Sequence, residues 1–534
     1  MQRNLIVLLL GISGMTALFY EIIWIRPLSL VFGTTVYAVS TIIASFIFGL
    51  AIGSWIAGKY TSRIQNPLRF FAFIQIGIGF YGILLLPTFS SLPPIYLELY
   101  RAVLPNQTLF FFVQIFLSFT IISLPAILMG TTLPLMMKSY AKKLSSVGYD
   151  VGKLDAANSV GAVVGTLVVG FLMIPYLGIQ TSVIIAAIIN LGMGVSILGI
   201  KKFVKYRYVV IIVIIAVPLF LLFPTYDVNP LTFPLYQRLN AFTGITVESY
   251  QNEINNQKLL HYEESQYGTI TVTEYKNKKT MKIAGKNQCG FASHGLEDAE
   301  NLAKIPTFLY QHNYDVKPET ALNVGLGCGA TSRWFGEHMN VTTVEIDPAV
   351  VKVTEKFSTG PITHNLIIDD GRNWLLKTDE KFDIITGQPS EVYDNHSSLF
   401  TKEYFELQRA HLHENGLSAQ WIPLYSMTMD DFFIFYNTYH SVFPEVHIYK
   451  NRVNSFKSLL LIGSEQPIQP IYNRNYLGSS HEIISRDTEL NTDDKTVLET
   501  STALNLYTPN RKVISEEQFY REAFLPTLDS IQKT

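Results

Sequence analysis

Three closely spaced glycines and two acids in the second half of the sequence have the types and spacing of a nucleoside-binding site. The run ALNVGLGCGATSRWFG is an apolar strand pattern that ends in Gly325, Gly327 and Gly329 and leads into a helical pattern. Glycines at this place let a ligand approach the backbone closely. Glu345 ends the next predicted strand, where a carboxylate can accept both ribose hydroxyls. Asp370 ends the third strand, where it can accept the adenine amino group.

The spacing of the glycines separates two kinds of nucleoside ligand. The loop reads G-x-G-x-G, whereas dinucleotide-binding folds carry G-x-G-x-x-G. A G-x-G-x-G loop alone also occurs in ordinary tight turns, but here acids follow at the ends of the next two predicted strands. The set therefore predicts an adenosylmethionine-type ligand rather than a dinucleotide.

Alternating strand and helix patterns position these residues. We predict strands at 321–325, 341–346, 365–369, 382–386 and 417–422, and helices at 330–338, 348–357, 371–377 and 401–414. Such alternation indicates a Rossmann-like α/β domain with a parallel sheet covered by helices on both faces. A ligand would bind beyond the carboxyl ends of the strands. Upstream, 268–275 and 279–285 alternate with period two and predict a β-hairpin.

The two halves of the sequence differ in composition. Residues 1–224 contain 14 basic and four acidic side chains, whereas the rest contains 27 basic and 39 acidic ones. Over the whole chain 48% of the residues are hydrophobic and 16% are charged, which is below the usual quarter. An acidic second half argues against nucleic-acid binding, which uses a basic patch. We expect a basic, apolar membrane half followed by an acidic half of ordinary composition.

Seven apolar runs in the first half are long enough to span a membrane, at about 20 residues per helix. They lie near 4–25, 35–58, 68–90, 108–137, 156–177, 180–200 and 206–224. Small residues four apart predict close helix packing, at Gly49 and Gly53 and again at Ala157, Gly161 and Gly165. We therefore expect a multi-pass α-helical membrane bundle surrounded by lipids.

Two features of this half each allow two interpretations. Glu21 lies inside the first run, and a membrane carboxylate is either functional or held by a structural partner. The fourth run contains Pro125, Gly130 and Pro134, which break or kink helices. Broken helices mark substrate sites in transporters, and a proline kink repaired by neighbouring helices is the other interpretation.

Basic residues concentrate in alternate loops and predict the orientation of the bundle. Three loops carry eleven of them: Lys59, Arg63, Arg69, Lys138, Lys142, Lys143, Lys153, Lys201, Lys202, Lys205 and Arg207. The N-terminus is therefore expected in the cytoplasm, and seven spans would place the second half outside. Adenosyl compounds are cytoplasmic, so the sequence leaves the side of the second half open.

Seven ordered motifs in the second half resemble the spermidine/spermine synthase family. They are ESQYGTITV, IAGKNQC, LNVGLGCGAT, TVEIDPAVV, DDGRNWL, KFDIITGQPSE and SLFTKEYFE, and they cover about residues 262–463. GLSAQWIPLYSM and LNTDDKTVLE, with YEIIW and LMGTTLPL in the first half, resemble its membrane-fused branch. The resemblance implies a class I methyltransferase-type domain and aminopropyl transfer from decarboxylated S-adenosylmethionine in polyamine biosynthesis.

The resemblance also implies roles for single residues. Gln288, Glu345 and Asp370 match the family's donor-binding glutamine, ribose acid and adenine-side aspartate. Tyr267 matches the tyrosine of its early strand. Within the glycine loop, Cys328 stands where the family has an aspartate. The nucleoside end of the family's pocket is therefore expected to be retained.

The amine end departs from the family pattern. The catalytic loop D-S-S-D-P of the family reads GQPSE here, so Gly387 and Ser390 replace both aspartates. Carboxylates hold the cationic tails and take the proton from the acceptor amine. Either a neighbouring group substitutes, with Glu391 and Asp394 as candidate catalytic acids and His396 as another base, or the ligand tail is not cationic. Intact S-adenosylmethionine, which carries a carboxylate there, suits the second choice.

The two cysteines, Cys289 and Cys328, predict neither a disulfide framework nor a metal site. We expect Cys328 to be a small buried residue rather than a reactive thiol. His411 and His413 are two residues apart and do not share a helix face. No metal is therefore expected.

Together these patterns predict three parts: a transmembrane domain of about seven helices at 1–225, a linker with a β-hairpin at 226–285, and a spermidine-synthase-like domain with a C-terminal extension at 286–534. The expected function is transfer of an aminopropyl or related group from decarboxylated S-adenosylmethionine or S-adenosylmethionine to a small amine or polyamine. A homo-oligomer is compatible with the sequence. The alternatives are a catalytically degenerate nucleoside-binding or scaffold domain, and a transporter with a polyamine- or nucleoside-sensing domain.

Overall fold

The computed structural model of the chain forms two compact units. It describes residues 2–103, 107–141, 144–200, 226–233, 235, 245–291, 293–358, 362–389, 397–452, 455–484, 486–505 and 514–524. The first unit holds the N-terminal helices together with residues 246–255 and 262–269, and the second holds most of the remaining chain, including 270–534. The two units are described separately below.

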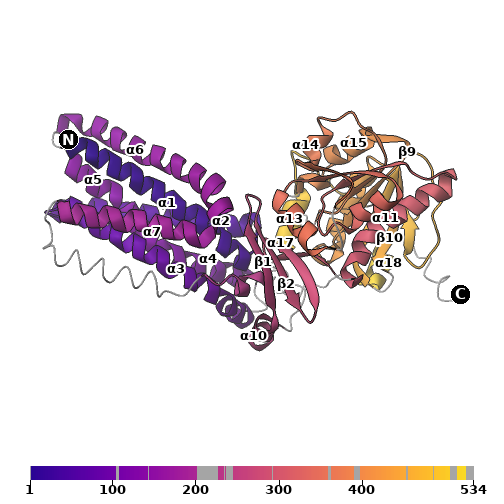
Figure 1. Ribbon diagram of the computed structural model, residues 1–534, viewed down its shortest axis with the longest axis horizontal. Helices are drawn as coiled ribbons and strands as arrows, with labels where there is room; N and C mark the ends of the chain where they lie inside the picture. Colours follow the sequence, from indigo (N-terminus) through magenta and orange to yellow (C-terminus); the bar gives the residue numbers. More distant parts are fainter. Residues whose placement is uncertain are drawn as a thin grey trace. The chain divides into compact units, whose positions relative to one another are not determined.

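The first unit is a bundle of long apolar helices (Figure 1). Its helices are α1 (Gln2–Phe32), α2 (Val36–Tyr60), α3 (Pro67–Val103), α4 (Gln107–Gly130), α5 (Thr132–Tyr140), α6 (Val147–Val168) and α7 (Ile174–Ile200). Five stretches of the described residues are long and apolar enough to cross a membrane, and the last of them, Val147–Gly199, contains both α6 and α7. Gly178, with φ 76°, interrupts that stretch.

Six of the seven predicted runs therefore coincide with helices. The fourth is divided at Thr131 into α4 and α5. The fifth and sixth run on either side of the break at Gly178 and pack differently, α6 against α1 and α7 against α3. The predicted run at 206–224 lies outside the described residues.

Glycines let the helix backbones approach one another closely, as the small-residue spacing predicts. A Cβ atom on Gly53 of α2 would lie 2.0 Å from the carbonyl oxygen of Ile127 in α4. One on Gly161 of α6 would lie 1.9 Å from the carbonyl oxygen of Gly11 in α1. Any larger residue would force these helix pairs apart.

A buried polar layer joins three of the helices. Thr16 of α1 donates a hydrogen bond to the Asn190 side chain of α7 at 2.8 Å, and Gln75 of α3 donates to Ser13 of α1 at 2.8 Å. All four side chains are buried. Because apolar packing alone does not fix the rotation of a helix, such bonds help to specify how α1, α3 and α7 pack. Glu21 is half-buried on α1.

A small antiparallel sheet follows the bundle in the sequence. Its strands are β1 (Lys258–Glu264), β2 (Thr269–Tyr275), β3 (Lys278–Ile283) and β4 (Lys286–Gly290), in that order. The β2–β3 pair confirms the predicted hairpin, and Lys276 and Asn277 form its turn with positive φ angles. The fourth strand extends the small sheet beyond residue 285.

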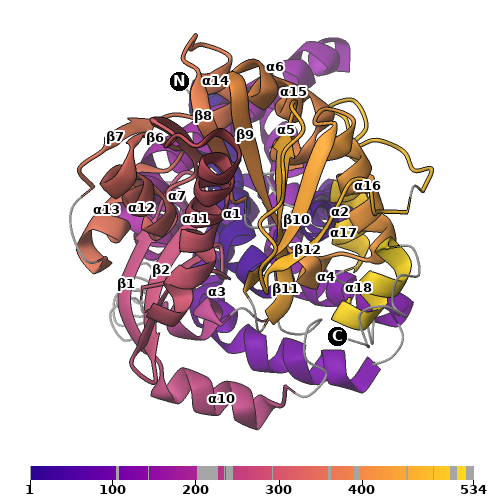
Figure 2. The same ribbon diagram turned by 90° about the vertical axis from the view of Figure 1, so that its right-hand side faces the viewer.

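The second unit is built on an eight-stranded mixed sheet in the order β12-β10-β11-β9-β8-β5-β6-β7 (Figure 2). Its strands are β5 (Thr320–Val324), β6 (Asn340–Glu345), β7 (Asn365–Ile368), β8 (Phe382–Gly387), β9 (Leu412–Ile422), β10 (Glu445–Arg452), β11 (Ser455–Ser464) and β12 (Tyr476–Ser479). Strands β5 to β9 are parallel to one another, which confirms the predicted parallel sheet. Strands β10, β11 and β12, which were not predicted, extend it beyond β9 in antiparallel pairs.

Helices cover both faces of this sheet. They are α11 (Ser293–Tyr314), α12 (Ala330–His338), α13 (Pro348–Phe357), α14 (Gly371–Leu375), α15 (Lys402–Ala410), α16 (Met429–His440), α17 (Val497–Asn505) and α18 (Glu516–Ala523). Successive residues of β5 point to opposite faces. Leu322 packs in the core that includes Phe405 and Phe432, whereas Ala321 packs with Ala303 and Phe335.

One predicted helix ends earlier than expected. The helix predicted at 401–414 stops at Ala410, and β9 begins at Leu412. The carbonyl of His411 accepts a hydrogen bond from the backbone N–H of Phe382, at 2.9 Å. Pairing with β8 therefore overrides the helical pattern of this segment, and β9 is longer than the predicted strand at 417–422.

Candidate functional site

The glycine loop connects β5 to α12 and requires glycine at three positions. Gly325, Gly327 and Gly329 have φ angles of 90°, 52° and 77°, in the left-handed region that side chains disfavour. The N–H of Gly325 donates to the carbonyl of Val344 on β6, at 2.8 Å. The loop thus turns directly over the carboxyl end of β5, where a ligand can meet backbone atoms.

Glu345, the last residue of β6, holds this loop in place. Its carboxylate accepts hydrogen bonds from the backbone N–H groups of Leu326, at 2.8 Å, and Asp347, at 2.9 Å. Burial raises the pKa of Glu345, and these backbone hydrogen bonds partly oppose that rise. Since each carboxylate oxygen has two lone pairs, both oxygens can still accept a ribose hydroxyl. Glu345 therefore holds the glycine loop in place and also offers acceptors for a ribose.

Asp370 lies at the neighbouring strand end. Ile368, at the end of β7, pairs with Glu345 in the sheet, and Asp370 follows two residues later. Its carboxylate accepts the N–H of Asn373, at 2.8 Å, and so caps the N-terminus of α14. The structure thus brings the glycine loop and both predicted acids to one edge of the sheet.

The strand on the other side of β5, which is β8, ends in a residue without a charged side chain. Gly387 ends β8, next to Val324 of β5, and pairs with Gln420 of β9 on its other side. A Cβ atom on Gly387 would lie 2.9 Å from the side-chain oxygen Oε1 of Gln420. Gln420 is fully buried, and its Oε1 has no hydrogen-bond partner among the residues that the structure describes.

Gln420 is a candidate that the sequence reasoning missed. The signal was present, because LSAQWI places one long polar residue in an apolar strand. A buried acceptor without a partner is costly, by about 1–3 kcal/mol. Such a group at the carboxyl end of a central strand is a candidate to meet a donor on a ligand.

The predicted substitutes for the family's aspartates, Glu391, Asp394 and His396, lie outside the described residues, as does Ser390. The catalytic roles of Glu391, Asp394 and His396 stay predictions.

The two candidates from the small sheet have different placements. Gln288 lies on β4, half-buried and adjacent to Cys289 in the unit that contains the glycine loop. Tyr267 belongs to the segment 262–269 that clusters with the helical bundle, and its side chain is exposed. The contact of Tyr267 with an adenosyl ligand stays a prediction.

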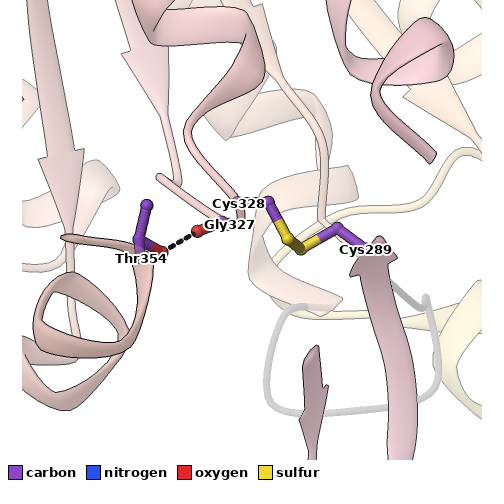
Figure 3. Close-up of a disulfide and its surroundings, with 4 residues drawn as sticks. All are labelled: Cys289, Gly327, Cys328 and Thr354. Atoms are coloured by element: carbon purple, nitrogen blue, oxygen red, sulfur yellow. Dashed lines mark hydrogen bonds between the residues drawn. A yellow bond between two sulfur atoms is a disulfide. The ribbon is translucent and has the colours of Figure 1, made fainter. Parts of the chain in front are cut away.

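A disulfide bond joins Cys289 to Cys328, so the expectation that the cysteines form no disulfide is wrong (Figure 3). The two residues are 39 positions apart, and the fold brings their Cα atoms to 6.0 Å. The bond connects β4 of the small sheet to the glycine loop of the large one. Cys328 is buried, as expected from its place in the loop.

Comparison with known proteins adds a family to this geometry. Residues 297–462 match the spermine/spermidine synthase domain. A polyamine aminopropyltransferase from Oceanobacillus iheyensis is 24% identical over 424 residues, which cover 76% of this chain and 75% of the relative. One from Leptospira interrogans is 24% identical over 430 residues, covering 78% of each chain. The crystal structure of spermidine synthase from Thermotoga maritima aligns at 19% identity and a TM-score of 0.35, covering 46% of this chain and 84% of that one.

The similarity extends beyond the α/β domain. The 424 aligned residues outnumber the 309 that follow residue 225, so the match reaches into the apolar half. Gly325, Gly327, Gly329, Glu345 and Asp370 lie within the matched segment, whereas Gln288 and Tyr267 precede it. Residues 297–462 of the chain are therefore similar to the spermine/spermidine synthase domain.

Proposed function

We propose that this chain is an aminopropyltransferase-like enzyme that binds an adenosyl donor and transfers its aminopropyl or related group to a small amine. The observation that carries the proposal is the glycine loop anchored on Glu345, in a domain of the spermine/spermidine synthase family. The relatives named as polyamine aminopropyltransferases support transfer rather than binding alone.

The nucleoside would lie across the ends of β5, β6 and β7. Glu345 would accept the ribose hydroxyls and Asp370 the adenine amino group, while the glycines allow close approach of the backbone. Gln288, on the strand next to the loop, would contact the donor from the small sheet. These contacts recognise the part shared by S-adenosylmethionine, its decarboxylated form and methylthioadenosine.

The transfer step needs a nucleophilic amine and a departing thioether. The amine lone pair forms a bond to the carbon next to the sulfonium, the carbon–sulfur bond breaks, and neutral methylthioadenosine leaves. The new ammonium then gives its proton to a base. Gln420 would accept an N–H of the amine through Oε1, because that atom is buried beside Gly387 and no described residue donates a hydrogen bond to it. An amide orients an amine but is a poor base.

The base itself is proposed from the segment that follows β8. Glu391 and Asp394, with His396 as the other candidate, are close in sequence to Gly387 and would take the proton. The apolar helices would hold the enzyme in a membrane with its N-terminus in the cytoplasm, in contact with lipids.

A second candidate function is nucleoside binding without catalysis. It is favoured by the absence of a carboxylate at the end of β8, where Gly387 stands. In that case the adenosyl ligand would bind and no group would be transferred.

One experiment separates the two candidates. Full-length protein in lipid nanodiscs is supplied with decarboxylated S-adenosylmethionine and a set of diamines, and methylthioadenosine release is measured by mass spectrometry. Amine-dependent release, abolished in Glu345→Ala, supports the enzyme. Binding of methylthioadenosine without release with any amine supports the second candidate. Absence of binding to any adenosyl compound at millimolar concentration contradicts both.

A further inference from the structure

The Cys289–Cys328 disulfide lies between two groups of candidate binding residues. Cys289 follows Gln288 on β4, and Cys328 stands between Gly327 and Gly329 in the glycine loop. Figure 3 shows the bond running from the end of β4 to the loop. It is therefore the covalent link between the strand that carries Gln288 and the loop that faces the nucleoside.

The glycine loop needs such support. Glycines lose more backbone freedom on ordering than other residues, and this loop contains three of them with positive φ. Two side chains outside the loop already hold it by hydrogen bonds: the Glu345 carboxylate accepts the N–H of Leu326, and the hydroxyl of Thr354 donates to the carbonyl of Gly327 at 2.5 Å. The disulfide holds the next residue, Cys328, through Cys289 on β4 of the small sheet. A loop ordered before the ligand arrives binds it more tightly.

The surroundings of the bond make it a structural one. Cys328 is 4% exposed and packs in an apolar cluster with Val272, Met281, Val350 and Val353. Cys289 is half-buried at the border of this cluster, so the bond is shielded mainly on the Cys328 side. Thiols that reduce disulfides need access to a sulfur atom, so this shielding slows exchange. Bonds of this kind persist in oxidising compartments and are rare in the cytosol.

We infer that the disulfide is a positioning element of the adenosyl pocket. The inference rests on the proposed function. The bond holds β4 and the glycine loop together, so that Gln288 and the loop backbone form one binding surface.

Ligand affinity tests the positioning role. Calorimetry of full-length protein with methylthioadenosine is carried out before and after reduction, beside the double variant Cys289→Ser/Cys328→Ser with and without reductant. We expect reduction to weaken binding about tenfold, which corresponds to roughly 1.4 kcal/mol of lost preorganisation. The double variant should show the weaker affinity in both conditions, with unchanged thermal unfolding of the helical bundle.

The outcomes separate this inference from the proposed function. Equal affinity in the oxidised and reduced protein overturns the positioning role while adenosyl binding stands. If reductant weakens methylthioadenosine binding by the double variant still further, the reductant acts on something other than this disulfide. That result also overturns the positioning role. If neither redox state binds, the proposed function fails first. Reduced wild-type protein serves as the second test if the double variant does not fold.

The state of the bond in cells tests whether this covalent link is present in the working protein. Cells that express the protein are quenched in acid, free thiols are blocked with N-ethylmaleimide, and a polyethylene-glycol maleimide is added after reduction. The chain has two cysteines, so the gel shift counts them directly. We expect two labels per chain, and one label at most in Cys289→Ser. Thiols already blocked in most wild-type chains would show that the bond is absent in cells and would overturn the positioning role.

Discussion

The strand ends on the two sides of β5 differ in what they offer a ligand. On one side, Glu345 ends β6 and Asp370 follows β7 by two residues, and both carboxylates accept hydrogen bonds from backbone N–H groups. On the other side, β8 ends in Gly387 beside the uncharged Gln420. The side that would hold the nucleoside keeps its acids, and the side that would hold the reacting amine does not.

This difference has a physical reason. Glu345 shapes the glycine loop and Asp370 caps α14, so each acid contributes to folding as well as to binding. Replacing either would leave buried or helix-terminal N–H groups unpaired. A carboxylate at position 387 has no such structural task. The fold itself therefore uses both acids at the proposed nucleoside end and uses none at position 387.

The largest expected effect is on turnover, at the end of the pocket that would hold the donor's tail and the reacting amine. Loss of a general base costs about a hundred- to ten-thousandfold, and Glu391 or Asp394 would recover only part of it, so we expect spermidine formation from putrescine to be slower than in a family member with both aspartates. Gly387→Asp should raise it about tenfold or more. Gly387 is not among the glycines with positive φ, so aspartate brings no backbone strain, and only the flexible end of Gln420 must move.

Gly387→Asn is the matched control, since it has the same size without the charge. Spermidine is measured by mass spectrometry and folding by thermal unfolding. An equal gain in the aspartate and asparagine variants would show that charge is not the missing element. Wild-type turnover equal to that of an ordinary family member would mean that Asp394 or Glu391 has taken the role of base.

The nucleoside end should respond next. Glu345→Ala removes the proposed ribose contact and leaves the N–H groups of Leu326 and Asp347 unpaired. We expect methylthioadenosine binding to weaken by at least about 1.5 kcal/mol and stability to fall by on the order of 2–4 kcal/mol. Calorimetry and denaturant unfolding measure the two. The exposed Glu380→Ala should change neither, and unchanged ligand affinity in Glu345→Ala would remove Glu345 from the site.

Two substitutions of Asp370 divide its roles as helix cap and as ligand contact. Asn retains an N-cap oxygen, so Asp370→Asn should alter stability by only a few tenths of a kcal/mol, whereas Asp370→Ala should cost about 1 kcal/mol. Both should weaken binding by roughly 0.5–1.5 kcal/mol, because both lose the charged acceptor. If Asp370→Asn binds as tightly as wild type, the residue is a cap alone.

The smallest effect is on the pH dependence of binding. Burial raises the pKa of Glu345. Its carboxylate should therefore take up a proton at a higher pH than an ordinary glutamate, whose pKa is about 4.3. Lowering the pH should therefore weaken methylthioadenosine binding. The same protonation should favour the folded state, because the native protein binds this proton more tightly than the unfolded chain.

Glu345→Gln cannot titrate at this position and is the control for the pH series. Its affinity should be low and should lack the wild-type decline. A wild-type affinity that stays constant down to pH 5 would show that Glu345 does not meet the ligand in its charged form.

The sequence predicted the parts of the fold that depend on local pattern. Strands β5 to β8 and helices α12 and α13 lie within a few residues of their predicted positions, because alternation and periodicity are properties of short segments. The antiparallel strands β10 to β12 were overlooked, although their apolar content was visible. The end of α15 depends on pairing between His411 and Phe382, which no local pattern contains.

The candidate site divides in the same way. Gly325, Glu345 and Asp370 are recognisable because each follows a strand of the repeating βαβ pattern. The disulfide and Gln420 depend on which strands become neighbours: Cys289 meets Cys328 across two sheets, and Gln420 meets Gly387 across β8 and β9. Such contacts are set by tertiary packing and could not be derived from spacing.

The central claim is that the nucleoside end is retained and the tail end has lost its preference for a cation. Calorimetry of the full-length protein with methylthioadenosine, decarboxylated S-adenosylmethionine and S-adenosylmethionine tests it most directly, since the three ligands share the nucleoside and differ in the tail. We expect methylthioadenosine and the decarboxylated donor to bind with affinities within about threefold of each other, a difference below 1 kcal/mol. Binding of the decarboxylated donor that is about a hundredfold tighter than that of methylthioadenosine would contradict the account, because it would require acids around the tail.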